Sequence, residues 1–347
     1  MILVTQEQEY FFTDFRYTEQ AAKQVRGFKI VESHREISAT IIEFLKKHKI
    51  KKLGFEASAT NYSQFLQLKK NLRGITLVST TEDPSKLREV KTEIEIRKIA
   101  KALQINKLAF EEIRHQIKPG VKEIEIKKYL EIAMLKHGAD KIGFDTIVAS
   151  GWRGALPHGV ASNKKIKAGE LVTVDFGCVF DGYNSDETVT ILVSDRNPTL
   201  RPSPIRGWEP LAVGRSLSIL QGERHREGFR RQLEIHQTVF DAQRAAIAAA
   251  RPGAKCSDID KAARDYITKA GYGQYFGHAL GHGVGLEVHE RPVLSPNSTD
   301  ALETGMVFTI EPGIYIPKFG GVRIEDVFVC TKSGTKQLSK INKKLGV

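Results

Sequence analysis

The sequence predicts an α/β (α+β) fold in two domains, a small N-terminal domain and a larger one composed of two similar halves. Three observations lead to this prediction. The chain has 347 residues, which exceeds one average domain. Its first 80 or so residues alternate short apolar strands with helical stretches. In the remainder, a segment of twenty residues recurs at an offset of 133 positions.

The predicted N-terminal domain covers residues 1–88. Its first two strands are close in the sequence and are expected to form a hairpin, and a helix with apolar residues at helical spacing follows. The expected strands cover residues 2–5, 10–13, 53–55 and 75–78, and the expected helix covers 36–48. Asp83 and Pro84 mark the domain boundary, beyond which a long helix is predicted over about 92–117.

The second predicted domain covers residues 89–347 and carries the internal repeat. Pro119–Gly138 and Pro252–Gly271 align without gaps, with identical residues at seven of twenty positions. Each copy has a helix before its Pro-Gly pair, a second helix after it and a glycine at the end. We interpret the repeat as two α/β halves with a site at their junction, although Pro-Gly followed by a helix is also a common turn.

Residues 196–232 depart from this pattern. They contain four prolines and eight arginines and show little periodicity. They separate a strand expected over 188–193 from a helix expected over 233–250, and such links are usually only a few residues long. We therefore predict an inserted, exposed and partly disordered loop, and we favour a tolerated insertion over a regulatory or binding segment.

The composition indicates a cytoplasmic globular protein. Hydrophobic residues make up 41% and charged residues 27% of the chain, and no apolar run approaches the roughly 18 residues of a membrane span. The start lacks the order of a signal peptide, and three widely spaced cysteines suit a reducing cytosol. The formal charge of +12 comes partly from 196–232, and elsewhere basic residues alternate with glutamates. We therefore expect neither a nucleic-acid nor a membrane partner.

Two aspartates stand where burial would be costly. Asp175 interrupts an apolar strand, and a buried carboxylate is unfavourable unless it is paired or binds a metal ion. Asp186 follows eleven residues later. A tight turn at Asp181 and Gly182 would put both aspartates on adjacent antiparallel strands.

Three further side chains have a similar setting. His282 lies between glycines that allow close approach of the backbone, Glu311 ends an apolar strand, and Glu325 interrupts another. Singly, such an acid is more often salt-bridged and such a histidine more often belongs to a core. Together, four buried carboxylates and one imidazole favour two hard divalent ions about 3.5–4 Å apart over a structural zinc site.

These five residues, in this order and within these motifs, resemble the metal ligands of the pita-bread metallopeptidases, which include methionine aminopeptidase, Xaa-Pro aminopeptidase and prolidase. The resemblance covers about residues 90–341 apart from the insert, and it implies a pita-bread catalytic domain of two pseudo-symmetric halves. It also implies two divalent metal ions, with manganese as the first candidate and cobalt, iron or zinc as the others.

The resemblance assigns the ligands to the two ions. Asp186 and Glu325 would bridge the ions, and Asp175 would hold one of them. His282 and Glu311 would hold the other ion, and Glu311 would also take a proton from a bridging water.

Four more residues match the substrate-binding residues of the family. His158 resembles the histidine that contacts the substrate, and His289 resembles the one that holds the scissile carbonyl and its oxyanion. His278 and Arg323 resemble residues of the proline-specific branch, although Arg323 could also be a structural partner of a nearby acid. By this resemblance the catalytic residues are His158, His289 and Glu311.

The N-terminal region points to the same branch. Residues 11–17 resemble part of the small domain of Xaa-Pro aminopeptidases and prolidases. Related proteins usually have several more strands and helices before this point, so the sequence starts as though truncated. Because the family often uses this domain for dimer contacts, a homodimer is possible.

The resemblance implies an Xaa-Pro aminopeptidase, which hydrolyses the bond between an N-terminal residue and a following proline in short peptides. Three alternatives remain, although the complete set of metal ligands argues against one of them, a metal-free creatinase-like hydrolase of the same fold. A prolidase would use the same ligands but cleave only dipeptides. A catalytically impaired or non-enzymatic member of the fold is the third reading, although such proteins usually lose ligands and all five are present here.

Overall fold

The computed structural model describes residues 1–347 except 35, 58, 81–83, 194–222, 344 and 346–347. The chain divides into two compact units, Met1–Pro84 and Ser85–Val347. Across the described residues, no helix is both long enough and apolar enough to cross a membrane.

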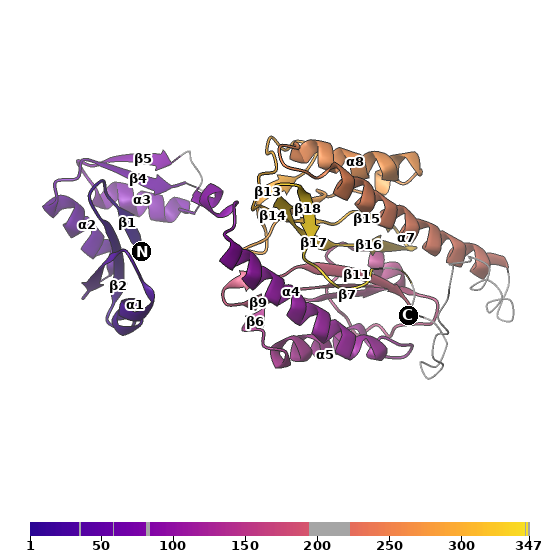
Figure 1. The fold of residues 1–347 in the computed structure, drawn as a ribbon. Helices are drawn as coiled ribbons and strands as arrows, with labels where there is room; N and C mark the ends of the chain where they lie inside the picture. The colour runs from indigo at the N-terminus through magenta and orange to yellow at the C-terminus, as the bar shows by residue number, and fades with distance from the viewer. Residues whose placement is uncertain (35, 58, 81–83, 194–222, 344, 346–347) are drawn as a thin grey trace. The chain divides into compact units, whose positions relative to one another are not determined.

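The N-terminal unit contains a three-stranded sheet and a two-stranded parallel sheet (Figure 1). The strands are β1 Ile2–Val4, β2 Glu9–Asp14, β3 Lys29–Ser33, β4 Lys52–Glu56 and β5 Thr76–Thr80. The helices are α1 Thr18–Gln24, α2 Ile37–Lys47 and α3 Tyr62–Asn71. The antiparallel pairing of β1 with β2 confirms the predicted hairpin. Phe12 and Leu45 are fully buried in the core of this unit because apolar residues recur on the inner face of α2.

The second unit begins with a short helical turn and the long helix α4, Glu93–Ile113. A capping box starts α4, since the Thr92 side chain accepts from the Glu95 amide and the Glu95 side chain accepts from the Thr92 amide. The start of this helix therefore follows from the local sequence, as predicted.

The internal repeat is visible in the backbone. Helix α5 spans Glu123–Lys136 and α8 spans Cys256–Lys269, so both of their ends differ by the 133 positions of the sequence repeat. The residues before the two helices also make matching bonds. The Gly120 amide donates to the Ile166 carbonyl at 2.9 Å, and the Gly253 amide donates to the Leu302 carbonyl at 2.8 Å. The predicted two-half organisation is thus confirmed.

Each half places three antiparallel strands beside its helices. In the first half the order is β11-β8-β7, and in the second β12, β14 and β17 are neighbours within a five-stranded sheet. In both halves a hairpin lies in the chain between the second and the third of these strands, β9–β10 in the first half and β15–β16 in the second. The strands of the first half are β6 Lys141–Ile142, β7 Ile147–Ser150, β8 Leu171–Phe176, β9 Cys178–Phe180, β10 Tyr183–Asn184 and β11 Glu187–Leu192. Those of the second half are β12 Gly281–Gly283, β13 Glu290–Leu294, β14 Val307–Ile310, β15 Gly313–Ile316, β16 Gly320–Arg323, β17 Asp326–Thr331 and β18 Gly334–Gln337.

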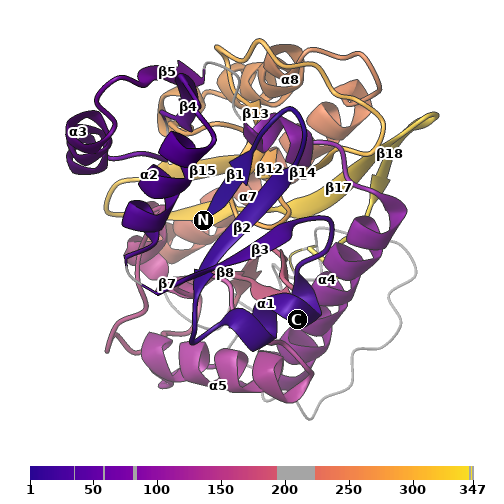
Figure 2. The ribbon, with the colours of Figure 1, turned by 90° about the vertical axis from the view of Figure 1, so that its left-hand side faces the viewer.

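The strands of this unit lie between two layers of helices. In Figure 1, α4 and α5 cover one side and α7 and α8 the other, and Figure 2 also shows α5 and α8 on opposite sides of the strands. Each layer closes its own apolar core. Phe176 is fully buried in the core under α4 and α5, and Phe308 is fully buried under α7 and α8.

Helix α7 starts earlier than the sequence suggested. It spans Glu223–Ala249, whereas we expected a helix only from residue 233. Arginine and glutamate are good helix formers, and no proline interrupts the chain between 211 and 251. In addition, the Arg231 guanidinium lies over the Phe319 ring at 5.0 Å, which holds the early part of the helix to the core. The rest of the predicted insert, up to residue 222, lies outside the described residues.

His236 on α7 makes the stability of the protein depend on pH. The side chain is 3% exposed, and burial lowers its pKa to about 4. Between about pH 6.5 and 4, the unfolded chain binds a proton there that the folded chain does not, so stability falls as the pH falls. The full effect is about 3 kcal/mol. We expect metal-free protein to lose this much more unfolding free energy between pH 7 and 4 than the His236→Gln variant does in denaturant titrations. Parallel pH curves for the two proteins would contradict this account.

Candidate metal centre

Four of the five predicted ligands, the acids, come from equivalent places in the two halves. Asp175 lies in β8, and Glu311 directly follows β14, the matching strand of the other half. Asp186 directly precedes β11, and Glu325 directly precedes β17. His282 is the middle residue of β12. The repeat therefore brings two acids from each half to the junction between the halves.

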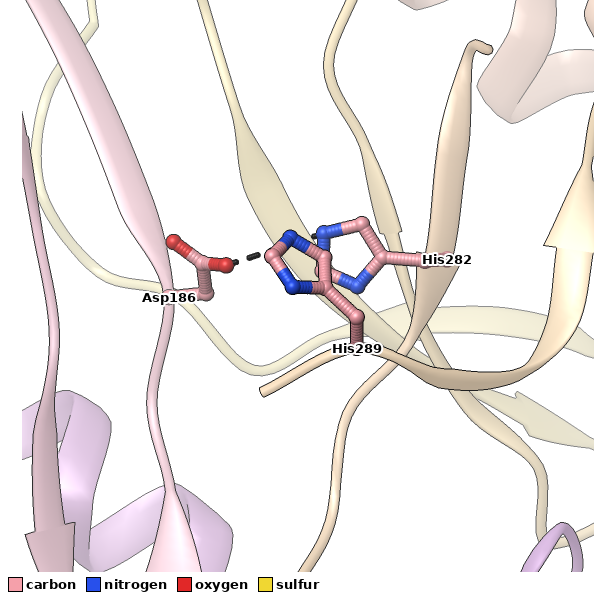
Figure 3. Close-up of side chains that lie close together, drawn as sticks. All are labelled: Asp186, His282 and His289. Atoms are coloured by element: carbon pink, nitrogen blue, oxygen red, sulfur yellow. Dashed lines mark ion pairs between the residues drawn. The ribbon is translucent and has the colours of Figure 1, made fainter. Parts of the chain in front are cut away.

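The ligand atoms of these residues form three overlapping groups, and within each group they lie within 4.8 Å of one another. The groups are Asp175, Asp186 and Glu325; His282, Glu311 and Glu325; and Asp186, His282 and His289. Figure 3 shows the third group, in which Asp186 and the two imidazole rings point toward one another. Because Glu325, Asp186 and His282 each belong to two groups, the residues form one continuous cluster.

The strands that carry the first two acids are joined by the predicted turn. The pairing of β8 with β11 is antiparallel, with Asp175 opposite Thr188. Asp181 and Gly182 both have positive φ angles, 47° and 82°, and they connect β9 to β10. These angles fit the type I′ hairpin turn, whose twist matches that of the strands it joins.

Glycines let the backbone of β12 approach its neighbours. A Cβ atom on Gly281 would collide with the Thr309 carbonyl, and one on Gly283 would collide with the Arg291 carbonyl. Only glycine fits at these positions, which explains why His282 is flanked by glycines on both sides. The close approach brings the His282 ring to Glu311 at the end of β14.

The tautomer of His282 is set by its backbone contact. Its Nδ1 lies 3.0 Å from the Gly283 carbonyl, which can only accept a hydrogen bond, so Nδ1 carries the proton. Nε2 faces the acids, at 3.2 Å from Glu311 Oε1 and 3.6 Å from Asp186 Oδ2. Once Nε2 has lost its proton, a histidine oriented in this way presents a nitrogen lone pair to a metal ion.

Two threonine hydroxyls hold the glutamates in place. Thr188 donates to Glu325 Oε2 at 2.8 Å, and Thr309 donates to Glu311 Oε1 at 3.2 Å. The Glu325 amide also donates to the Thr188 carbonyl, at 3.2 Å. The sequence analysis missed both threonines, because a threonine within a strand carries no signal that its hydroxyl meets an acid.

The acids perturb one another strongly. Burial, followed by repulsion from the neighbouring carboxylates, raises the pKa values of Asp186 and Glu325 well above their usual range. Burial also raises the pKa of Glu311, but the hydrogen bond and the charge of His282 outweigh it and leave that pKa below its ordinary value. The same contact raises the pKa of His282 against the effect of its burial.

The donor set fits divalent cations. Four carboxylates and one imidazole are ligands that hard or intermediate divalent ions accept. Asp175 Oδ1 is buried and has no hydrogen-bond partner among the residues that the structure describes. A buried carboxylate oxygen without a partner is unfavourable, and a bound cation would satisfy it.

Arg323 is enclosed by protein contacts. Its guanidinium pairs with Asp175 and donates to the Thr188 hydroxyl at 3.0 Å and to the Tyr315 hydroxyl at 2.9 Å. It also donates to the Pro157 carbonyl at 3.2 Å, next to His158 in the chain. The structural pairing that the sequence analysis left open is therefore present.

Tyr315 connects Arg323 to His278. The His278 Nδ1 lies 2.7 Å from the Ala279 carbonyl and must donate to it, so the Tyr315 hydroxyl donates to Nε2 at 2.9 Å. Burial lowers the pKa of His278 and keeps the ring neutral. The sequence analysis missed Tyr315, although a tyrosine within a buried strand signals a hydroxyl in need of a partner.

The remaining two histidines are both exposed. His289 contacts the His282 ring, with 4.2 Å between the ring centres. Burial and then the charge of His282 lower the pKa of His289. His158 is exposed in a turn.

Comparisons with known proteins agree with this arrangement. Residues 97–332 match the Metallopeptidase family M24, and residues 1–90 match the Creatinase/Prolidase N-terminal domain. An Xaa-Pro dipeptidase of Pyrococcus horikoshii is 42% identical over 296 residues, which cover 85% of this chain and 75% of that protein.

Two solved structures are similar over nearly the whole chain. An Xaa-Pro dipeptidase from Bacillus anthracis has a TM-score of 0.86 at 41% identity, with 99% of this chain and 88% of that chain covered. An X-Pro aminopeptidase from Thermotoga maritima MSB8 has a TM-score of 0.82 at 33% identity, with 99% and 89% covered. The chain therefore belongs to metallopeptidase family M24, and it combines a creatinase-type N-terminal domain with a prolidase-like pita-bread catalytic domain.

Proposed function

We propose that this protein is an Xaa-Pro dipeptidase that hydrolyses dipeptides ending in proline with the help of two divalent metal ions. The observation that carries the proposal is the cluster of overlapping ligand groups at the junction of the two halves. The sequence analysis placed an Xaa-Pro aminopeptidase first. The dipeptidase is better supported, because relatives at 41–42% identity bear that name and the aminopeptidase neighbour is 33% identical.

The ligand groups suggest how the ions would be shared. Asp175, Asp186 and Glu325 would hold one ion, and His282, Glu311 and Glu325 the other. Asp186 also lies within reach of His282, so it suits a bridging role together with Glu325. Oxygen-rich ligation with one nitrogen favours manganese, with cobalt, iron and zinc as further candidates.

Bound ions would supply a water of lowered pKa and would polarise the scissile carbonyl. Glu311 is the residue for the proton transfer. Its pKa is lowered by His282, so the carboxylate is ionised near neutral pH and can accept a proton from the attacking water. The same carboxyl group can then give the proton to the proline nitrogen as it leaves.

His289 and His158 are suited to hold the peptide. The pKa of His289 is lowered, so its ring stays neutral and can donate one N–H to the carbonyl oxygen as negative charge develops there. His158 is exposed and can contact the peptide from the open side. These two residues and Glu311 form the proposed catalytic set.

His278 and Arg323 belong to the proposed pocket in a different way. Both ring nitrogens of His278 and the guanidinium of Arg323 already have partners within the protein. We propose that these two residues, with Tyr315, form a rigid wall that shapes the space for proline. Direct binding of the peptide by their polar atoms would require one of these hydrogen bonds to open.

Metal uptake should release protons. Asp186 and Glu325 have raised pKa values in the metal-free protein, and carboxylates must ionise to bind metal. The number of protons released per manganese should therefore increase as the pH falls from 8 to 6. Titration calorimetry in two buffers of different ionisation enthalpy measures this number. Identical heats in both buffers at pH 6 would show that no proton moves and would argue against raised pKa values.

Neutral substitutions of the shared ligands should remove tight metal binding. Asp186→Asn and Glu325→Gln keep the side-chain volume but lose the charge, and each should lower the tight manganese stoichiometry from two to one or none. Asp145→Asn is the matched control, because the Asp145 side chain is 83% exposed and belongs to none of the ligand groups. Two tightly bound ions in either ligand variant would refute the assignment.

Hydrolysis assays separate the candidate activities. After chelation and return of manganese, the protein should cleave Ala-Pro but not Ala-Pro-Ala, and Glu311→Gln should reduce the rate about 100-fold or more. Cleavage of the tripeptide would make the protein an Xaa-Pro aminopeptidase. Folded, metal-loaded protein that cleaves neither peptide would be a non-enzymatic member of the family.

A further inference from the structure

A buried lysine near the C-terminal end lies close to the ligand cluster. The Lys343 side chain is 4% exposed, and its ammonium group lies 3.2 Å from Glu187 and 3.8 Å from Asp326. The two acids are as deeply buried, with side chains that are 0% and 5% exposed. A buried cation between two buried acids forms only when the contacts are well aligned, because each charge loses its hydration.

The two partner acids hold equivalent positions in the two halves. Glu187 follows the proposed ligand Asp186 directly and is the first residue of β11. Asp326 follows the proposed ligand Glu325 directly and is the first residue of β17. Lys343 therefore pairs with the first residue of β11 and with the first residue of β17. Each of these two residues directly follows one of the proposed shared ligands, one in each half.

The segment that precedes Lys343 is held to β17 by hydrogen bonds. The Leu338 amide donates to the Val327 carbonyl at 2.8 Å, and the Val327 amide donates to the Ser339 hydroxyl at 2.8 Å. These bonds attach the chain before Lys343 to β17. The position of the ammonium group is thus fixed by the fold and does not depend on a freely moving chain end.

Other contacts hold the same two acids. The Gln243 amide of α7 donates to Asp326 Oδ2 at 3.0 Å and to the Ile310 carbonyl at 3.1 Å. Burial raises the pKa of Glu187 to about 6, against the Lys343 ammonium, which lowers it. Lys343 is the only described side chain that pairs as a cation with both acids.

We propose that Lys343 is a positioning residue for the metal centre, which holds Asp186 and Glu325 in ligand geometry by pairing with the acids that follow them. The inference rests on the proposed function of these residues as metal ligands. In a strand, consecutive side chains point to opposite faces, so an anchor on one residue restrains its neighbour on the other face. Lys343 would act through this restraint without touching the ions.

The direction in which the metal affinity changes when Lys343 is removed distinguishes a positioning role from an effect of its charge alone. A lysine near the site repels metal cations, so its removal should strengthen metal binding if only its charge mattered. If Lys343 positions the ligands, its removal should weaken metal binding instead. Loss of a residue that orients metal ligands typically costs 10–100-fold in affinity.

The test measures the affinity of the full-length protein for manganese by titration calorimetry. We expect Lys343→Met, which keeps the length but not the charge, to bind manganese about 10–100-fold more weakly. Lys343→Arg should restore most of the affinity. Lys164→Met is the control, because it also removes a lysine from an ion pair, at 2.6 Å from Glu170, but no proposed ligand adjoins that pair.

Thermal unfolding of the metal-free proteins separates stability from metal affinity. If Lys343→Met does not fold, the triple variant Glu187→Gln, Asp326→Asn, Lys343→Met replaces it, because it leaves no unpaired buried charge. This variant should also bind manganese more weakly than the unmodified protein.

The outcomes have distinct meanings. Unchanged or tighter manganese binding by a folded Lys343 variant overturns the positioning role and leaves the proposed function intact. An unmodified protein that binds no manganese overturns the proposed function and the inference with it. Weaker binding by Lys343→Met but not by Lys164→Met supports the positioning role.

Discussion

The repulsion among four closely spaced carboxylates, two buried and two partly buried, is the constraint on which this structure depends. Asp175, Asp186, Glu311 and Glu325 cannot all be ionised in such a cluster without compensating positive charge. Burial and repulsion raise the pKa values of Asp186 and Glu325. These two side chains therefore contribute less to the stability of the metal-free fold as the pH rises through their folded pKa values. Cations that bind only the folded state would offset this loss and would thereby couple metal binding to folding.

The internal repeat explains how a chain assembles such a cluster. Each half supplies one acid at the end of its second strand and another just before its third strand. Each half has its own apolar core, and the acids of both halves meet at the junction between them, among the strands that lie between the two layers of helices (Figures 1 and 2).

Protein cations divide the surroundings of the cluster into two regions. Arg323 pairs with Asp175 on the side of Tyr315 and His278, and Lys343 pairs with the acids behind the shared ligands. His278, which Tyr315 links to Arg323, and the exposed His289 keep neutral imidazoles, because burial lowers their pKa values. A pocket with neutral donors and fixed walls suits an uncharged proline ring and a carbonyl that becomes negative only during the reaction.

The sequence alone determined the repeat, the N-terminal hairpin, the start of α4 and the five residues that converge, since these depend on local periodicity, turn residues and short motifs. Only the tertiary structure decided which partners orient them. Tyr315 and His278 are 37 positions apart, and Lys343 and Glu187 are 156 apart. No local pattern encodes such contacts, because they exist only after the two halves and the C-terminal segment have packed together. The early start of α7 was missed for a related reason, since packing of Arg231 on Phe319 stabilises a segment whose own periodicity is weak.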